Sequence, residues 1–312
     1  MTPQRPVPLP ALPGTGNLWR TGQLQEKGLN SRAIKALILH GQLVRLRHGC
    51  YIRAELWEKQ TRPVRSRQLI RAHAHGTLTA SAGGYVNSHT SAARLHGLYL
   101  WDVDDLIHIL LPGNPSSERL GKDVRGHTRA WTALEVVTLG GLRVTSLERT
   151  AVDCAMMLGY RQALVLMDHA LRLGADKFLM ETMADGLQGR RGIRTLRLAL
   201  AYADPRSESA GETLTRELLI RLKLPLPEPQ VAVATRAGRY RLDFAWKEKK
   251  VALEFDGKTK YFDYRPTPEV LFQERQREKA LTENGWTFVR VTWADLFREH
   301  EFKARILRRV GT

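Results

Sequence analysis

The sequence predicts an α/β protein built from several domains. Its 312 residues exceed what one compact core usually needs, and its 43% hydrophobic and 26% charged residues are typical of a folded chain. Segments with helical periodicity alternate with segments of strand-type alternation. The predicted parts are a flexible tail, a first small domain, a mixed α/β domain, a helical linker and a last α/β domain, at residues 1–17, 18–60, 61–175, 176–205 and 206–312.

The charge of the chain favours a polyanionic partner. Lys and Arg number 49 against 32 Asp and Glu, which gives a net charge of +17 and a pI near 10.3. Release of counterions from a nucleic acid would drive association with such a protein. Charge alone does not separate DNA from RNA, and basic residues are often only solvated, so local patterns have to decide.

Cysteine usage and hydropathy predict a cytoplasmic protein that does not enter a membrane. The two cysteines, Cys50 and Cys154, lie far apart without a His or Cys at metal-ligand spacing, which indicates reduced thiols. No apolar run approaches the roughly 18 residues of a membrane span, and the proline-rich residues 1–16 lack the apolar segment of an export signal.

The first domain has the pattern of a winged helix. Thr21 is expected to cap a short helix, and Asn30 or Ser31 a second helix that ends near Gln42. Alternating apolar and basic residues then predict a β-hairpin over 43–53. Helix, turn, helix and basic hairpin follow in the order of a winged helix, whose second helix enters the major groove of DNA.

Four basic residues of this domain are candidate DNA contacts. Apolar residues at helical spacing turn one face of the second helix inward, which leaves its outer face basic, and the first strand of the hairpin alternates apolar residues with arginines. We therefore expect contacts with DNA from Arg32, Lys35, Arg45 and Arg47. The alternative is a domain that binds protein and whose arginines are solvated.

The second domain is expected to mix helices and strands. Helices are predicted at 65–75, 89–96 and 146–158, and a strand at 106–111. Arg149 and Asp153 stand four residues apart on a predicted helix, so we expect them to form an ion pair that fixes packing. His96, directly before Gly97, is expected to end its helix.

From about Leu18 to Leu173 the chain resembles the AbiEi-type antitoxins of bacterial toxin–antitoxin systems. The resemblance rests on the predicted winged helix, on TSAARLHGL at 90–98 and on TSLERTAVD at 145–153, in that order. It implies autoregulation through DNA binding and suggests a cognate toxin protein as a partner.

A second predicted hairpin concentrates carboxylates in the last domain. Two strand-type runs, 240–246 and 251–256, flank a short polar loop. A symmetric loop pairs Trp246 with Val251 and sets Asp243 opposite Glu254, with Cβ atoms about 4.5–5.5 Å apart. Alternation assigns Asp243, Glu254 and Asp256 to one face, and it assigns to the other face the residues Tyr240, Leu242, Phe244, Trp246, Val251, Leu253 and Phe255.

Facing carboxylates repel each other unless a cation lies between them. The candidates are a basic side chain, Arg241 or Lys258, and a divalent metal with oxygen ligands. Mg²⁺ or Mn²⁺ held by Asp243, Glu254 and Asp256 would polarise a phosphate, and Lys258 would orient or activate water. This combination predicts hydrolysis of phosphodiester bonds.

The stretch from about Ser209 to Leu296 resembles the PD-(D/E)xK nucleases, and among them the very-short-patch-repair-like endonucleases with a restriction-endonuclease-like α/β fold. The matching motifs, in order, are GET at 211–213, RLD at 241–243, LEFDGK at 253–258, the helix around 275–278, NGW at 284–286 and VRVTW at 289–293.

The resemblance implies roles for single residues. Asp243 and Glu254 correspond to the metal-binding acids, Glu212 to the upstream helical acid, and Arg277 to a helix residue that contacts phosphate or an acid. The lysine of the superfamily usually stands two residues after the second acid, where this chain has Asp256, so Lys258 occupies a shifted position.

Two hypotheses follow from these patterns. The first is an enzyme in a defence or toxin–antitoxin setting, in which the winged helix places a metal-dependent endonuclease domain on DNA. The second is an antitoxin-like repressor whose nuclease-like domain does not cleave.

Overall fold

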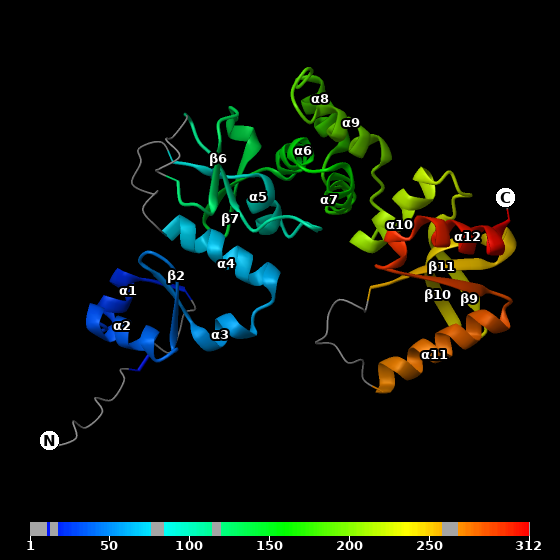
Figure 1. The fold of residues 1–312 in the computed structure, drawn as a ribbon, viewed down its shortest axis with the longest axis horizontal. Helices are drawn as coiled ribbons and strands as arrows, with labels where there is room; N and C mark the ends of the chain where they lie inside the picture. Colours follow the sequence, from blue (N-terminus) through cyan, green and yellow to red (C-terminus); the bar gives the residue numbers. More distant parts are fainter. Residues whose placement is uncertain (1–10, 13–17, 76–83, 114–119, 258–267, 312) are drawn as a thin grey trace. The chain divides into compact units, whose positions relative to one another are not determined.

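The computed structural model describes residues 11–12, 18–75, 84–113, 120–257 and 268–311 (Figure 1). Internal contacts divide the chain into two compact units. Unit 1 comprises residues 1–98 and 103–153, and unit 2 comprises residues 99–102 and 154–312. The expected tail at 1–17 lies outside the described residues, apart from Ala11 and Leu12.

The first part of unit 1 has the predicted order of helix, turn, helix and hairpin. Its elements are β1 (Leu18–Arg20), α1 (Thr21–Glu26), α2 (Ser31–Leu39), β2 (Leu43–Arg47), β3 (Cys50–Arg53) and α3 (Ala54–Lys59). The strands form an antiparallel sheet in the order β1-β3-β2. Buried Trp19, Leu24 and Leu37 pack together beneath it.

The helix ends in this part differ from expectation in two places. Asn30 caps α2 as predicted, because its side chain accepts a hydrogen bond of 2.9 Å from the amide of Ala33. Thr21 is not a cap: α1 begins directly after Arg20, whose amide donates to the Gln23 side chain at 2.9 Å. The second helix ends at Leu39, before Gln42.

The remainder of unit 1 surrounds a five-stranded sheet in the order β6-β5-β4-β8-β7. Its elements are α4 (Arg62–His75), β4 (Val86–Asn87), α5 (His89–His96), β5 (Ile107–Leu110), β6 (Val124–His127), the 3-10 turn η3 (Ala133–Glu135), β7 (Val136–Leu139), β8 (Leu142–Thr145) and α6 (Leu147–Met157), which carries the boundary between the units. β5 pairs with β6 and β4 with β8 in parallel, while β4–β5 and β7–β8 are antiparallel.

The predicted ion pair in this part is present. The Arg149 Nε donates to Asp153 at 2.8 Å, and both side chains are buried. Glu135 and Arg129 complete the network at 2.7 Å each, so two carboxylates balance two guanidinium groups. His96 ends α5 as expected, with Gly97 in the left-handed region at φ 78°.

Unit 2 begins with three helices, α7 (Tyr160–Arg172), α8 (Lys177–Asp185) and α9 (Ile193–Tyr202), so two helices occupy the expected linker region at 176–205. The elements that follow are α10 (Ala210–Arg221), β9 (Glu228–Thr235), β10 (Gly238–Trp246), the 3-10 turn η4 (Lys247–Lys249), β11 (Val251–Asp256), α11 (Pro268–Glu283), β12 (Thr287–Thr292), the 3-10 turn η6 (Asp295–Phe297) and α12 (Glu299–Val310). The sheet order is β12-β11-β10-β9; β9, β10 and β11 are antiparallel, and β12 is parallel to β11.

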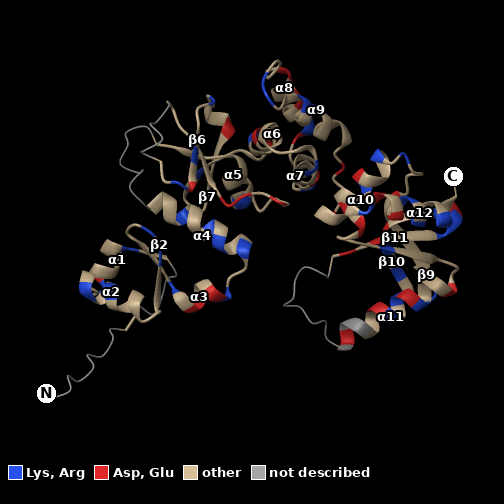
Figure 2. Ribbon diagram, in the orientation of Figure 1, with Lys and Arg blue, Asp and Glu red and all other residues tan. Residues whose placement is uncertain are grey.

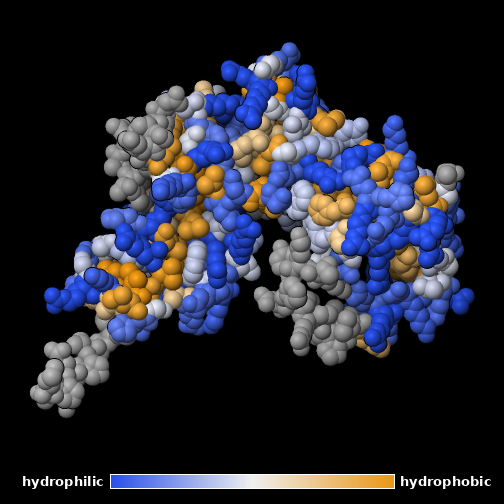
Figure 3. All heavy atoms as spheres, viewed as in Figure 1, coloured by the Kyte–Doolittle hydropathy of each residue, from blue (hydrophilic) through white to orange (hydrophobic). Residues whose placement is uncertain are grey.

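Helices cover both faces of this four-stranded sheet (Figure 1). On one face, α10 and α12 supply Leu218 and Phe302 to a core that includes Phe244 and Leu253. On the other face, α11 contributes Leu281 to a core around Trp286, Ala245 and Ala252. The visible surface over α11 and α12 is mostly hydrophilic (Figure 3), as expected of helices whose apolar sides face the sheet.

The predicted assignment of β10 side chains to one face of the sheet is wrong for Tyr240 and Leu242, which precede Asp243. Trp246 pairs with Val251 as expected, and Phe244 and Trp246 share one core with Val251. Tyr240 and Leu242, however, pack in the opposite core, under α11. The neighbouring strand β9 explains the switch, because Gln230, opposite this point, has a left-handed φ of 55° that breaks the regular pleat.

Both cysteines are free thiols and both are buried. Among the described residues, no helix is sufficiently long and apolar to cross a membrane.

Candidate active site

The predicted carboxylates of unit 2 line one cavity. It has a volume of about 310 Å³ and lies where β10 and β11 separate, beside α11. Its walls comprise Asp243, Glu254, Phe255, Asp256, Gly257, Glu274, Arg277 and Arg290. The structure therefore brings Asp243, Glu254 and Asp256 together, as the hairpin register predicted.

Asp243 is a half-buried acid on this cavity. Its Oδ2 accepts a hydrogen bond of 3.0 Å from the amide of Phe255, so the side chain ties the middle of β10 to β11 just beyond the last paired residues. Burial raises the pKa of Asp243, and the neighbouring charge of Glu254 adds to the rise. An acid in this state gains from any cation that enters the cavity.

Arg277 of α11 is the cation that contacts the acid pair. Its guanidinium makes an ion pair with Glu254, with a second contact at 3.4 Å from Nη1 to Oε2, and it also donates to the backbone oxygen of Arg241 at 3.0 Å. Arg241, one of the candidate cations named from the sequence, instead pairs with Glu208 at 2.6 Å. The predicted acid contact of Arg277 is present.

Glu212 is a buried acid that stabilises the start of α10. Its carboxylate accepts hydrogen bonds from the Ser209 hydroxyl at 2.8 Å, the Glu208 amide at 2.9 Å and the Gln230 side chain at 2.9 Å. Burial raises its pKa, and the charge of Asp243 contributes to the rise. Glu212 therefore caps the start of α10 while it lies within electrostatic reach of Asp243.

A glycine allows α10 to approach the site. A Cβ at Gly211 would lie 1.9 Å from the ring of Phe255, so any other residue would displace β11. Phe255 packs edge-on against Trp293 at 5.1 Å, and its amide is the donor to Asp243. The position of the acid pair thus depends on close packing between α10 and β11.

Lys258, the predicted catalytic lysine, lies outside the described residues, which end on this side at Gly257. Asp256 is half-buried on the cavity wall, two residues after Glu254. Arg290 of β12 also lines the cavity and was not predicted from the sequence, because the parallel pairing of β11 with β12 brings it opposite Glu254.

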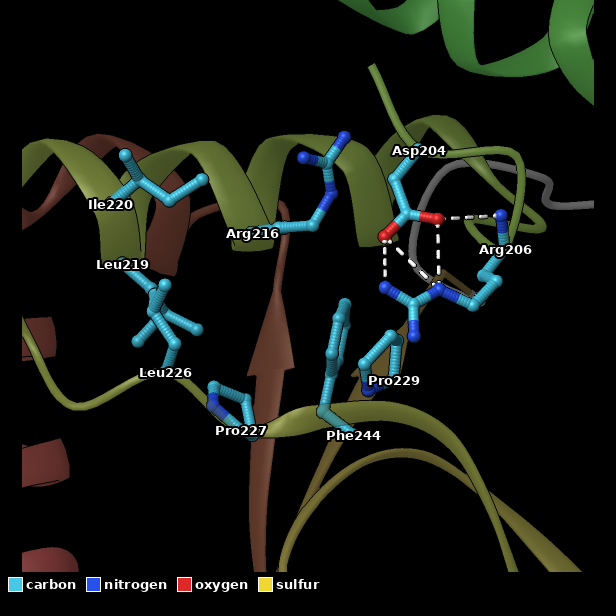
Figure 4. Close-up of a pocket in the computed structure, with 9 residues that line it drawn as sticks. All are labelled: Asp204, Arg206, Arg216, Leu219, Ile220, Leu226, Pro227, Pro229 and Phe244. Atoms are coloured by element: carbon cyan, nitrogen blue, oxygen red, sulfur yellow. Dashed lines mark hydrogen bonds and ion pairs between the residues drawn. The ribbon is translucent and has the colours of Figure 1, made fainter. Parts of the chain in front are cut away.

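A second cavity in unit 2, of about 200 Å³, is shown in Figure 4. Its walls are largely apolar, and its two arginines are held by acids: Arg206 by Asp204 at 2.7 Å, and Arg216 by Asp168 at 2.6 Å. The second ion pair connects α10 with α7, whereas Arg206 and Asp204 both belong to the segment between α9 and α10. With both arginines paired, the acid-lined cavity is the better equipped for chemistry.

The predicted DNA contacts of unit 1 fall into two groups. Arg32, Lys35 and Arg45 are exposed, the first two on α2 and the third on β2, where basic residues are visible in Figure 2. Arg47 instead makes an ion pair with Asp123, and its side chain is only 18% exposed. It is thus less available for a phosphate than its neighbour on the strand.

The chain is similar to two proteins of Mycobacterium tuberculosis, the uncharacterized protein MT2308 of strain CDC 1551 / Oshkosh and the uncharacterized protein Rv2248 of strain ATCC 25618 / H37Rv. Each is 34% identical over 216 residues, which cover 68% of this chain and 77% of the relative. The chain belongs to their family. No family model matches it. A structural similarity to the crystal structure of the RV2827C protein from Mycobacterium tuberculosis covers 69% of this chain and 79% of that one, with 16% identity and a TM-score of 0.37.

The acid-lined cavity of this family member suits a hard divalent cation. Asp243, Glu254 and Asp256 offer carboxylate oxygens, the ligands that Mg²⁺ and Mn²⁺ prefer. Burial, and then the neighbouring charge of Glu254, raise the pKa of Asp243, while Arg277 acts in the opposite direction. The residues present therefore fit such an ion.

Proposed function

We propose that this protein binds DNA and hydrolyses phosphodiester bonds in a reaction that depends on Mg²⁺ or Mn²⁺ bound in the acid-lined cavity of unit 2. The observation that carries the proposal is the meeting of Asp243, Glu254 and Asp256 on one cavity wall. The succession of elements, one helix, three antiparallel strands, a helix and a strand parallel to the third, is also the arrangement expected of a restriction-endonuclease-like domain.

The acids and basic residues named for this site have separate roles in this proposal. Asp243, Glu254 and Asp256 would hold the metal ion, which when bound polarises the phosphate and lowers the pKa of a coordinated water. Arg277 and Arg290 would contact phosphate oxygens, since both line the cavity. Glu212 is a positioning residue, because it fixes the start of α10 beside Asp243. Lys258 remains the expected lysine of the site.

Unit 1 would supply the affinity for DNA. Its helix, turn, helix and hairpin suit a winged helix, with Arg32 and Lys35 on the exposed face of α2 and Arg45 on the hairpin. These side chains contact phosphates or base edges in the proposal, and Arg47 supports the hairpin through Asp123.

A cleavage assay with a matched pair of variants tests this proposal. The full chain is incubated with supercoiled, linear and single-stranded DNA in Mn²⁺ or Mg²⁺, with EDTA as control. Asp243→Asn should lower the cleavage rate at least about 100-fold, as removal of a single preorganised charged group in an active site does. The control variant Glu283→Gln removes the charge of an exposed acid at the end of α11, and it should cleave like the wild type.

One observation favours a second function, a repressor or antitoxin that binds DNA without cutting it. Glu254 is engaged by Arg277, and Asp256 replaces the usual lysine two residues later, as in a site that has lost its catalytic cation. This alternative keeps DNA binding by unit 1 and a toxin protein as a partner. DNA that stays intact in every metal, while still shifting in a gel, would select it.

A further inference from the structure

Three histidines of unit 1 form a cluster that the proposed function does not use. One ring nitrogen from each of His89, His108 and His127 lies within 4.8 Å of the other two. The residues come from the start of α5, the middle of β5 and the end of β6. His89 and His108 are buried, and His127 is half-buried.

Strand pairing brings two of these rings together. Ile107 and Ile109 pack against Ile70 of α4, so His108 between them points to the opposite face of the sheet. β5 and β6 are parallel, with Leu110 beside His127, which places His127 on the same face as His108. The Nδ1 of His108 lies 2.9 Å from the Nε2 of His127.

His89 is held over the pair by an unusual backbone. Its φ of 46° lies in the left-handed region, which residues other than glycine adopt rarely and at some energetic cost. Its ring stacks on His127 with centroids 3.7 Å apart, and its Nδ1 is 3.0 Å from the Ser88 hydroxyl. The Nε2 of His89 is therefore the nitrogen left for a ligand.

The charge state of the cluster suits a metal rather than an anion. Burial lowers the pKa of both His108 and His127 to about 4, and it lowers the pKa of His89 well below its usual value. The rings are therefore neutral at pH 7 and carry the lone pairs that metal ions bind. Arg149 and Arg129 near His89 are balanced by Asp153 and Glu135, which limits their repulsion of a cation.

One atom of the cluster lacks the partner that its burial calls for. The Nε2 of His108 is buried without a hydrogen bond in the described part of the chain, and the Oδ1 of Asp104 lies 3.8 Å from it. A metal on the Nδ1 of this ring would fix a proton on Nε2, directed toward a carboxylate. Histidines that bind metals are commonly oriented in this way.

We propose that His89, His108 and His127 bind a divalent transition metal of the zinc type through Nε2, Nδ1 and Nε2, with Asp104 orienting His108. Tetrahedral Zn–N bonds of about 2.0–2.1 Å separate ligand nitrogens by about 3.3 Å, so the His108–His127 contact opens by a few tenths of an ångström. The stacked rings of His89 and His127 must also rotate. The bound ion connects α5, β5 and β6 and leaves one coordination position to solvent.

Co²⁺ titration of the full chain, with any histidine tag removed, tests the proposal. The wild type should bind one equivalent in a four-coordinate site with intense visible bands, and Zn²⁺ should displace the Co²⁺. His127→Gln should weaken Co²⁺ binding at least about tenfold, since loss of even a residue that only orients a ligand costs about 10–100-fold in metal affinity. His48→Gln, which changes an exposed histidine in the same unit, should bind Co²⁺ like the wild type.

Two results would overturn the proposal. One is a folded wild type that develops no such bands; the other is equal Co²⁺ affinity of His127→Gln and His48→Gln. If His127→Gln does not fold, the wild type still decides the matter by NMR. Zn²⁺ should move the ring signals of three histidines, and a spectrum in which those signals stay in place counts against the site.

Discussion

The two units gather possible metal ligands in opposite ways. In unit 1, three neutral imidazoles converge within 4.8 Å of one another, and among the described residues no three acids of unit 2 come as close. In unit 2, half-buried carboxylates line a cavity of about 310 Å³, with Arg277 bound to one of them. The first site is compact and uncharged, and the second is open and negative.

This difference predicts two classes of ion. Imidazole nitrogens favour Zn²⁺, Co²⁺ or Ni²⁺, whereas carboxylate oxygens favour Mg²⁺ or Mn²⁺. The compact site joins α5, β5 and β6 of one unit through its ion, so it is suited to stabilising unit 1. The open site leaves room for a phosphate beside the ion, so it is suited to a reaction.

Acidification should destabilise unit 1 through its buried histidines, and His73 of α4, which lies outside the histidine cluster, gives a large effect. Its ring is 4% exposed, and burial lowers its pKa from 6.5 to about 4. Above pH 6.5 the ring is neutral in both states. Below it, only the unfolded chain binds the proton, so the stability of unit 1 falls until the folded pKa is reached, by up to about 3 kcal/mol.

Hydrogen exchange of the α4 amides between pH 7 and 4.5 measures this loss. His73→Leu should reduce the pH dependence, whereas the exposed His48→Leu should keep that of the wild type. At Asp243 the folded pKa is raised, so protonation relieves repulsion there as the pH falls. An equal pH dependence in wild type and His73→Leu would show that His73 ionises while folded.

Bound metal ions should change the stability of the units by nearly as much as protonation of His73 does. A ligand at about 100 times its dissociation constant stabilises the folded state by about 2.7 kcal/mol. Mn²⁺ should therefore raise the melting temperature of the wild type, and Asp243→Asn should lose most of that shift. Without metal the variant should melt no lower than the wild type, since an asparagine oxygen can still accept from Phe255 while the charge is gone.

Melting curves with and without Mn²⁺ separate this expectation from its rival. If Arg277 alone neutralises the acids, Mn²⁺ shifts neither protein, and the metal-dependent reaction has to be abandoned. Zn²⁺ provides the second half of the comparison, because Asp243→Asn should keep any stabilisation that the histidine cluster supplies.

The sequence predicted the acidic cavity and missed the histidine cluster, and the reason is the range of the contacts. Asp243 and Glu254 lie on adjacent strands joined by a short loop, so a count from the turn gives their register. His108 and His127 meet through a parallel pair, whose register no turn fixes. The histidines themselves were visible, but β6 was not predicted.

The error at Leu242 has a related cause. Alternation from Trp246 backwards assumed an unbroken pleat, and the irregularity at Gln230 belongs to β9, a strand that was not predicted. Arg277 was singled out only by family resemblance, since its approach to Glu254 depends on how α11 crosses the sheet. Local patterns thus gave the strands and the acids, while tertiary packing gave their cation.

Arg277 directly affects the balance of charge in the acidic cavity of unit 2, because it pairs with Glu254. Arg277→Gln leaves Glu254 without its cation in a half-buried site, which should destabilise the metal-free protein by about 1–2 kcal/mol. Saturating Mn²⁺ should narrow the difference, because the ion compensates the same charge. Arg275→Gln, an exposed arginine two residues earlier on α11, is the matched control. Urea unfolding with and without Mn²⁺ measures both, and a difference that Mn²⁺ leaves unchanged would assign Arg277 to packing alone.

The smallest expected effect concerns the contribution of the unit 1 hairpin to DNA binding. If the hairpin of unit 1 holds the phosphate backbone, Arg45→Ala removes one exposed contact and should make the slope of log K against log salt shallower by about 0.9. Arg47→Ala should change the slope less, because its guanidinium is already paired with Asp123. Arg275→Gln provides a charge loss of the same size in the other unit. Fluorescence anisotropy with a labelled duplex, in EDTA and from about 50 to 200 mM salt, measures all three slopes. Equal slopes for Arg45→Ala and the wild type would remove the hairpin from the DNA interface and move the binding surface elsewhere on the chain.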